Sequence, residues 1–260
     1  MSHLDFTLWI ISFALQAASI TLVLRVKPIG RFGAFLTFLV CWTIGDLLYF
    51  WLRANTNFLY LLYWLIQAAN NTVALVAVMN VFRDALQLVR RRFGSLSFLA
   101  PLMIFLLIDF LFWRKLQHSF PHGWLGMVTS LAVSLVLGIS LLQSAIAVLC
   151  LWLRHKYGIF GRRSLGVLGG FGFIGAGVVM AYFARVEFGP RLEDVFRYVP
   201  SFASTCAMVI WIVIFSLPDS GEDRRRYDPE RIERFLKLAN RYVEDVREAM
   251  DRWRLRYGGA

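Results

Sequence analysis

The sequence predicts an all-α, polytopic membrane protein with seven transmembrane helices, and two observations lead to this fold class. The chain of 260 residues is 58% hydrophobic with a mean hydropathy of +0.58, which is too apolar for a soluble domain of this length. Its apolar residues fall in blocks long enough for a helix of about 20 residues to cross a bilayer. None of these blocks alternates polar with apolar residues as a membrane-barrel strand would. The predicted segments are residues 5–24, 33–52, 58–82, 96–113, 124–153, 165–184 and 199–217.

The distribution of basic residues predicts the orientation. When the connections are numbered alternately, eleven Lys and Arg residues lie on the side of the carboxy terminus and six on the other. Because cytoplasmic loops retain Lys and Arg, we expect the amino terminus outside and the carboxy terminus in the cytoplasm of a bacterial-type inner membrane. The first segment has no basic leader and is followed by Arg25 and Lys27, which suits an uncleaved anchor. The net charge of +11 then reflects topology and contact with anionic lipids, not nucleic-acid binding.

The third segment carries a cluster of polar side chains at membrane depth. At about 100° per residue, the polar and small residues of this segment share an arc of about 140°. Lipid offers no hydrogen-bond partners, so we expect this stripe to face other helices. It would join helices through its amides or, alternatively, line a ligand or water site. The residues of the stripe are Gln67, Asn70, Asn71, Ala74, Ala77 and Asp84.

The first, second and fourth segments contribute further polar residues. Gln16 lies at mid-depth of the first segment, whereas Asp46 falls in the outer half of the second and Asp109 near the outer end of the fourth. Pairing of Asp109 with a neighbouring cation is the simpler alternative to a ligand site. The candidate ligand-binding residues are Asp46, Gln67, Asn70, Asn71, Asp109 and Trp113, with Trp51 and Trp124 in the surrounding aromatic belt.

Missing residue types exclude several functions. No lysine lies in a predicted membrane segment, so a retinal Schiff base has no amine, and the four histidines lie in loops or at ends, which disfavours bis-histidine haem. His118 and His122 are weak candidates for zinc, because Pro121 between them opposes a helix there. The three cysteines sit singly, and no phosphate-binding or hydrolase motif occurs. We therefore expect that the protein binds no metal and no cofactor and is not an enzyme.

Glycines recur through the sixth predicted segment, where Gly166 and Gly170 are four residues apart, as are Gly172 and Ala176. Such spacings let helix backbones approach closely. Because glycines occupy several faces of this segment, we expect packing inside the bundle rather than a dimer surface.

The composition changes after Pro218. We expect a transmembrane domain over 1–217, a linker over 218–227 and a cytoplasmic amphipathic helix over 228–257, which Asp228-Pro229-Glu230 would begin. Apolar residues recur there with heptad spacing, and the tail from Asp219 is nearly neutral. We expect it to pack on a partner helix or a second copy, with packing on the bundle's own inner loops as the alternative. The candidate output residues are Arg83, Asp84, Ile232, Phe235, Ala239, Tyr242, Val246 and Trp253.

Seven helices of this orientation with a helical cytoplasmic exit resemble the sensor modules that precede bacterial histidine kinases, and the layout is similar to that of G-protein-coupled receptors. Arg83-Asp84-Ala85 reverses the Asp-Arg-Tyr order of those receptors. The resemblance implies a sensory or receptor-like protein that binds a small or lipidic ligand in its outer half. Its output would pass through the tail to a separate protein. The alternatives are a non-catalytic scaffold subunit of a larger membrane complex and, third, a transporter.

Overall fold

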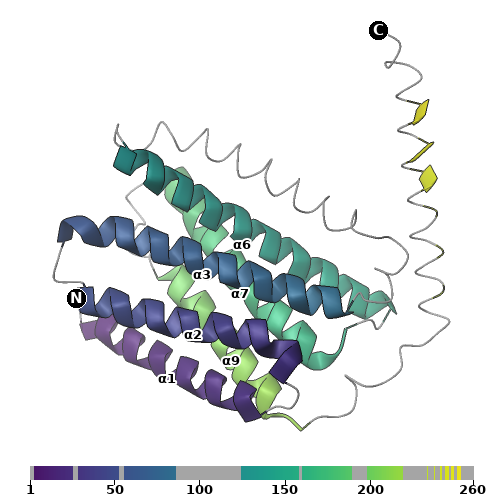
Figure 1. Cartoon of the computed structure of the whole chain (residues 1–260), viewed down its shortest axis with the longest axis horizontal. Helices are drawn as coiled ribbons and strands as arrows, with labels where there is room; N and C mark the ends of the chain where they lie inside the picture. Colours follow the sequence, from purple (N-terminus) through teal and green to yellow (C-terminus); the bar gives the residue numbers. More distant parts are fainter. Residues whose placement is uncertain are drawn as a thin grey trace.

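The computed structural model describes six long helices (Figure 1). The described residues are 3–25, 29–52, 56–85, 124–157, 160–188 and 198–218, with single residues of the tail between 233 and 252. Within these ranges all regular structure is helical. The helices are α1 (His3–Arg25), α2 (Ile29–Leu52), α3 (Thr56–Ala85), α6 (Trp124–Tyr157), α7 (Arg162–Phe188) and α9 (Val199–Ser216).

All six helices are long and apolar enough to cross a membrane. They correspond to six of the seven predicted segments, and the remaining segment, 96–113, lies outside the described residues. Five of the helices extend beyond the predicted apolar blocks at one or both ends, so that α7 covers 27 residues and α6 covers 34. Backbone groups near lipid must be hydrogen-bonded within the chain, which favours helix up to and beyond the boundary of the hydrocarbon core. α9 instead ends at Ser216, one residue before the end of its predicted block.

The helices form a closed ring. Each contacts the next in the order α1, α2, α3, α6, α7 and α9, and α9 contacts α1 again. A further contact between α3 and α7 crosses the ring. α6 lies on one side of this contact, and α1, α2 and α9 lie on the other. α7 therefore packs against three helices, α3, α6 and α9.

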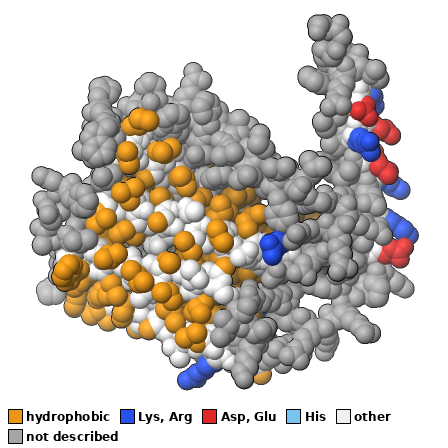
Figure 2. Space-filling model, viewed as in Figure 1, with side chains coloured by type: hydrophobic (Ala, Val, Ile, Leu, Met, Phe, Trp, Pro, Cys, Tyr) orange, Lys and Arg blue, Asp and Glu red, His pale blue; other side chains and the backbone are white. Residues whose placement is uncertain are grey.

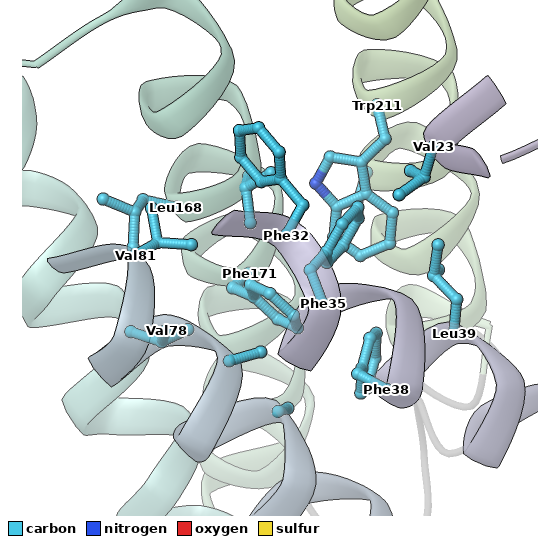
Figure 3. Close-up of a cluster of buried hydrophobic side chains, with 14 of the residues drawn as sticks. Val23, Phe32, Phe35, Phe38, Leu39, Val78, Val81, Leu168, Phe171 and Trp211 are labelled. Carbon is cyan, nitrogen blue, oxygen red and sulfur yellow. The ribbon is translucent and has the colours of Figure 1, made fainter. Parts of the chain in front are cut away.

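An aromatic core fills the space between α2, α7 and α9 (Figure 3). Trp211 and Phe35 are wholly buried, and their ring centroids lie 4.9 Å apart in an edge-on arrangement. Phe38 and Phe171 meet at 4.8 Å in the same manner, which is a favourable geometry for aromatic rings. The members of the aromatic core are Phe32, Phe35 and Phe38 of α2, Phe171 of α7, and Trp211 and Phe215 of α9.

The glycines of α7 bring its two neighbours close. Gly172 and Gly175 face α6, and Gly166, Gly170 and Gly177 face α9. A Cβ atom at Gly175 would overlap the Ser140 carbonyl oxygen, and one at Gly170 would overlap the Trp211 ring. The Ser144 hydroxyl also donates across this contact to the Gly172 carbonyl oxygen at 3.2 Å. The expectation that these glycines pack inside the bundle is confirmed.

Apolar side chains cover the face of the bundle seen in Figure 2, where charged side chains lie at its edge and along the tail. Among the most exposed are Trp51, Val148 and Phe202. Large contiguous apolar surfaces mark membrane or protein contact, so this surface suits lipid. The described tail residues are helical, charged and exposed, and Lys237 pairs with Glu233 at 3.0 Å. The apolar stripe predicted for the tail lies outside the described residues.

Candidate functional site

A partly buried acid–amide pair joins α1 to α2. The Gln16 side chain is wholly buried, and its Nε2 donates to Asp46 Oδ2 at 2.6 Å and, more weakly, to Ser12 Oγ at 3.4 Å. Ser12, Gln16 and Ser19 are spaced by four and three residues, which places them on one face of α1. The α1–α2 site is defined here as Ser12, Gln16, Ser19 and Asp46.

The two side chains meet although their positions differ in depth. Gln16 is nine residues before Arg25, whereas Asp46 is seventeen residues after Ile29. Side chains on a helix lean toward its amino terminus. In two antiparallel neighbours, Gln16 and Asp46 therefore lean toward each other, and the long glutamine side chain closes the remaining gap.

Several polar atoms at this site are left without partners. Gln16 Oε1 and Ser19 Oγ are buried and make no hydrogen bond with the described part of the chain, and the same holds for the indole Nε1 of Trp9. A buried polar group without a partner costs about 1–3 kcal/mol, so such groups require an explanation. The α1–α2 site therefore has unused hydrogen-bonding capacity next to an acid.

Aromatic rings lie one helical turn from the pair. Phe50 follows Asp46 by four residues, and Phe13 precedes Gln16 by three. The Trp9 ring stacks on Phe50 with a centroid distance of 4.3 Å and lies 5.7 Å from Phe13. These rings form an aromatic cluster next to the pair along both helices, toward the amino terminus of α1.

The polar stripe predicted on α3 does face other helices, because Asn70, Ala74 and Ala77 are buried. Asn70 packs against α2, where a Cβ atom at Gly45 would lie 2.9 Å from its Nδ2. Asn71 Nδ2 instead donates to the carbonyl oxygen of Gln67 in its own helix at 2.8 Å. This arrangement favours helix contact over ligand binding for Asn70.

Among the described ligand candidates, Asp46 and Asn70 do not lie together. Gly45 faces α3 and its neighbour Asp46 faces α1, so Asn70 and Asp46 lie on different sides of α2. Trp51 is 82% exposed, whereas Asp109, Trp113, and the side chains of Trp124 and Asp84 lie outside the described residues. Arg83 is exposed at the end of α3. The sequence placed Gln16 at mid-depth of the first segment but did not identify Asp46 as its partner. The signal that singles out Gln16 is that it is the only amide in that segment.

A second set of buried polar groups lies on α6. Ser140 Oγ and Gln143 Nε2 are buried without a hydrogen-bond partner among the described residues. The Ser140 and Gln143 carbonyl oxygens lie beside Gly175 and Gly172 of α7. No acid of the described residues is recorded at this contact, which distinguishes it from the α1–α2 site.

Two arginines connect α7 to the end of α9. Arg162 Nη2 donates to the Pro218 carbonyl oxygen at 3.0 Å, and Arg163 Nη2 reaches the Leu217 carbonyl oxygen at 3.5 Å. Cations at a helix carboxy terminus also interact favourably with its dipole. We call this pair the arginine clamp. It lies where the chain leaves α9 for the tail.

The described residues contain no group of three or more His, Cys, Asp or Glu side chains that could hold a metal ion. Cys41, Cys150 and Cys206 are free thiols, and the weak zinc candidates His118 and His122 lie outside the described residues. The chain matches no protein-family model, no curated protein and no solved structure.

Proposed function

We propose that this chain is a sensory, receptor-like seven-helix membrane protein. It binds a small or lipidic ligand at the α1–α2 site and signals through its carboxy-terminal helix. The observation that carries this proposal is the hydrogen bond between the buried Gln16 and Asp46, which leaves Gln16 Oε1 without a partner among the described residues. Ionisable groups within membrane segments are costly and are retained where they act on a ligand, an ion or a structural change. The acid faces a neighbouring helix and not the exposed apolar surface, which supports a binding role.

The ring order supplies a route from this site to the tail. α1 contacts both α2 and α9, so a ligand that separates or tightens the Gln16–Asp46 pair changes how α1 packs on α9. The arginine clamp holds the end of α9 against the start of α7. A shift of α9 relative to α7 would then act on the clamp and on the tail helix beyond it.

The proposed orientation is amino terminus outside and carboxy terminus in the cytoplasm of a bacterial-type inner membrane. The excess of Lys and Arg on the side of the carboxy terminus supports it. α3 and α6 run in the same direction (Figure 1), which supports a further crossing by the predicted segment 96–113. The sensor modules of histidine kinases, which the proposed layout resembles, also have seven helices and a cytoplasmic exit.

The proposed coupling is tested by hydrogen exchange on the full chain in lipid nanodiscs. We expect Asp46→Leu to change amide exchange in the last turn of α9 and in the tail, since it breaks the bond to Gln16. Thr21→Val on the exposed face of α1 is the control, because its hydroxyl donates to the Ala17 carbonyl oxygen of its own helix. Changes in amide exchange that are confined to α1 and α2 in the Asp46 variant would contradict the proposal.

The scaffold alternative has a different test. A stable, stoichiometric complex with other membrane proteins after purification in mild detergent would support it.

The arginine clamp leads to a separate prediction. Replacing Arg162 and Arg163 together by Gln removes two charged hydrogen bonds to the end of α9. Such bonds contribute about 1–2 kcal/mol when they are partly exposed, so we expect amide exchange at residues 215–218 to become about tenfold faster. Arg252→Gln is the control, because the hydrogen bond recorded for Arg252 among the described residues goes to the Glu248 carbonyl oxygen, one turn away in the tail. Equal exchange in both variants would show that the clamp does not hold the exit of α9.

A further inference from the structure

We propose that the α1–α2 site takes the protonated nitrogen of an amine, so that the ligand class is an alkylammonium. This inference rests on the proposed function, because it names the ligand of the same site. Three features of the site lead to it: its charge, its unused hydrogen-bond acceptors and the aromatic rings next to it.

The charge of the site is not balanced within the described part of the chain. Asp46 accepts an amide N–H from Gln16, and the ion pair recorded among the described residues joins Lys237 to Glu233 in the tail. An isolated carboxylate at membrane depth is unfavourable unless a positive charge or a proton compensates it. A ligand with one positive charge supplies this compensation.

Asp46 and Gln16 both present unused acceptors. An ionised carboxylate has about four lone-pair sites, and a primary ammonium group offers three donors and no acceptor. Gln16 Oε1 is fully buried without a partner, and Ser19 Oγ on the same face of α1 also lacks one. A carboxylate oxygen of Asp46 and the adjoining Gln16 Oε1 would accept two of the three donors of an ammonium group. Mg²⁺ and Ca²⁺ carry two positive charges, whereas the α1–α2 site contributes one carboxylate, which a singly charged ligand balances.

The aromatic rings suit an organic cation. Phe13 and Phe50 lie one turn from Gln16 and Asp46 along their own helices, and the Trp9 ring contacts both of them. Ring faces attract an ammonium group within about 6 Å, and tryptophan does so most strongly. The same rings provide an apolar surface for the alkyl part of the ligand.

The test uses n-butylammonium as the probe and the full chain in nanodiscs of zwitterionic lipid. Ligand that binds the folded protein raises the unfolding temperature by mass action. We expect a saturable rise of several degrees for the unmodified protein and for Glu233→Gln, which removes one acid from the tail. We expect no rise for Asp46→Asn, which keeps the size of the side chain and removes its charge. An equal rise in Asp46→Asn, or an equal rise with 1-butanol or with sodium chloride, would overturn the proposal.

Two further variants keep the proposal testable if Asp46→Asn does not fold. Gln16→Met removes the unpartnered acceptor at similar volume, and we expect about tenfold weaker binding of butylammonium. Trp9→Leu removes one ring, and we expect binding to weaken by about threefold. Unchanged affinity in both variants would place the amine elsewhere.

Failure of this inference is distinguishable from failure of the proposed function. If butylammonium binds in an Asp46-dependent manner but leaves amide exchange in the tail unchanged, the amine site stands and the sensory function fails. If another compound changes exchange in the tail while butylammonium does not bind, the function stands and the amine inference fails.

Discussion

Gly175→Ala is expected to destabilise the bundle by about 2–3 kcal/mol, because overpacking a close helix contact forces the backbones apart. The added Cβ would meet the carbonyl oxygen of Ser140 and lie 2.8 Å from Ser144 Oγ. Backbone atoms of α6 cannot rotate away as a flexible side chain can. Separation of α6 from α7 would also lengthen the hydrogen bond from Ser144 to Gly172.

The matched control for this variant is Gly169→Ala on the same helix. A Cβ atom at Gly169 would have no neighbour within 4 Å, so the change should act only through helix propensity. Alanine is favoured over glycine in a helix by about 1 kcal/mol, and we expect a neutral or slightly stabilised protein. Equilibrium unfolding in mixed micelles of mild detergent and sodium dodecyl sulfate measures both free energies. Equal values for the two variants would show that α6 and α7 are not in close contact.

Trp211→Ala is expected to have the other large effect, a loss of about 3–5 kcal/mol, as found for aromatic residues in packed cores. The Trp211 ring contacts Phe35, Phe38 and Phe171, so its removal leaves a cavity between α2, α7 and α9. Lipid is as apolar as the core, and the loss comes mainly from packing and not from transfer out of water.

Trp51→Ala is the control for this second prediction. The Trp51 side chain is 82% exposed, so we expect a change within about 0.5 kcal/mol. The same unfolding measurement compares the two tryptophans, and Trp211→Phe should recover more than half of the loss because it refills most of the cavity. A loss at Trp51 as large as that at Trp211 would contradict the placement of the core.

The membrane segments could be predicted from the sequence because their signal is local. Blocks of about 20 apolar residues need no knowledge of the fold to be recognised, and six of the predicted blocks appear as helices. The packing role of the α7 glycines could also be predicted, since several faces of one helix carry them. The helix ends were harder to predict, because hydrogen bonding continues the helix past the apolar block at both ends of α7.

The α1–α2 site shows why the candidate site was only partly predicted. Asp46 stood out by itself as an acid within an apolar segment, whereas its partner depends on which face of α1 turns toward α2. Asn70 shows the opposite case, because its polarity suggested a site and its neighbour Gly45 makes it a packing contact. Rotation of each helix about its own axis follows from all of its neighbours together and not from its own residues.

Composition and periodicity alone thus determined that this chain has apolar helices that can cross a membrane and that its polar residues at depth are few. Tertiary structure decided which of them meet: Gln16 with Asp46, Asn70 with Gly45, and the clamp arginines with the end of α9. The physical reason is that burial in lipid acts on each segment separately, whereas packing and hydrogen bonding between helices require a particular neighbour at a particular depth and angle.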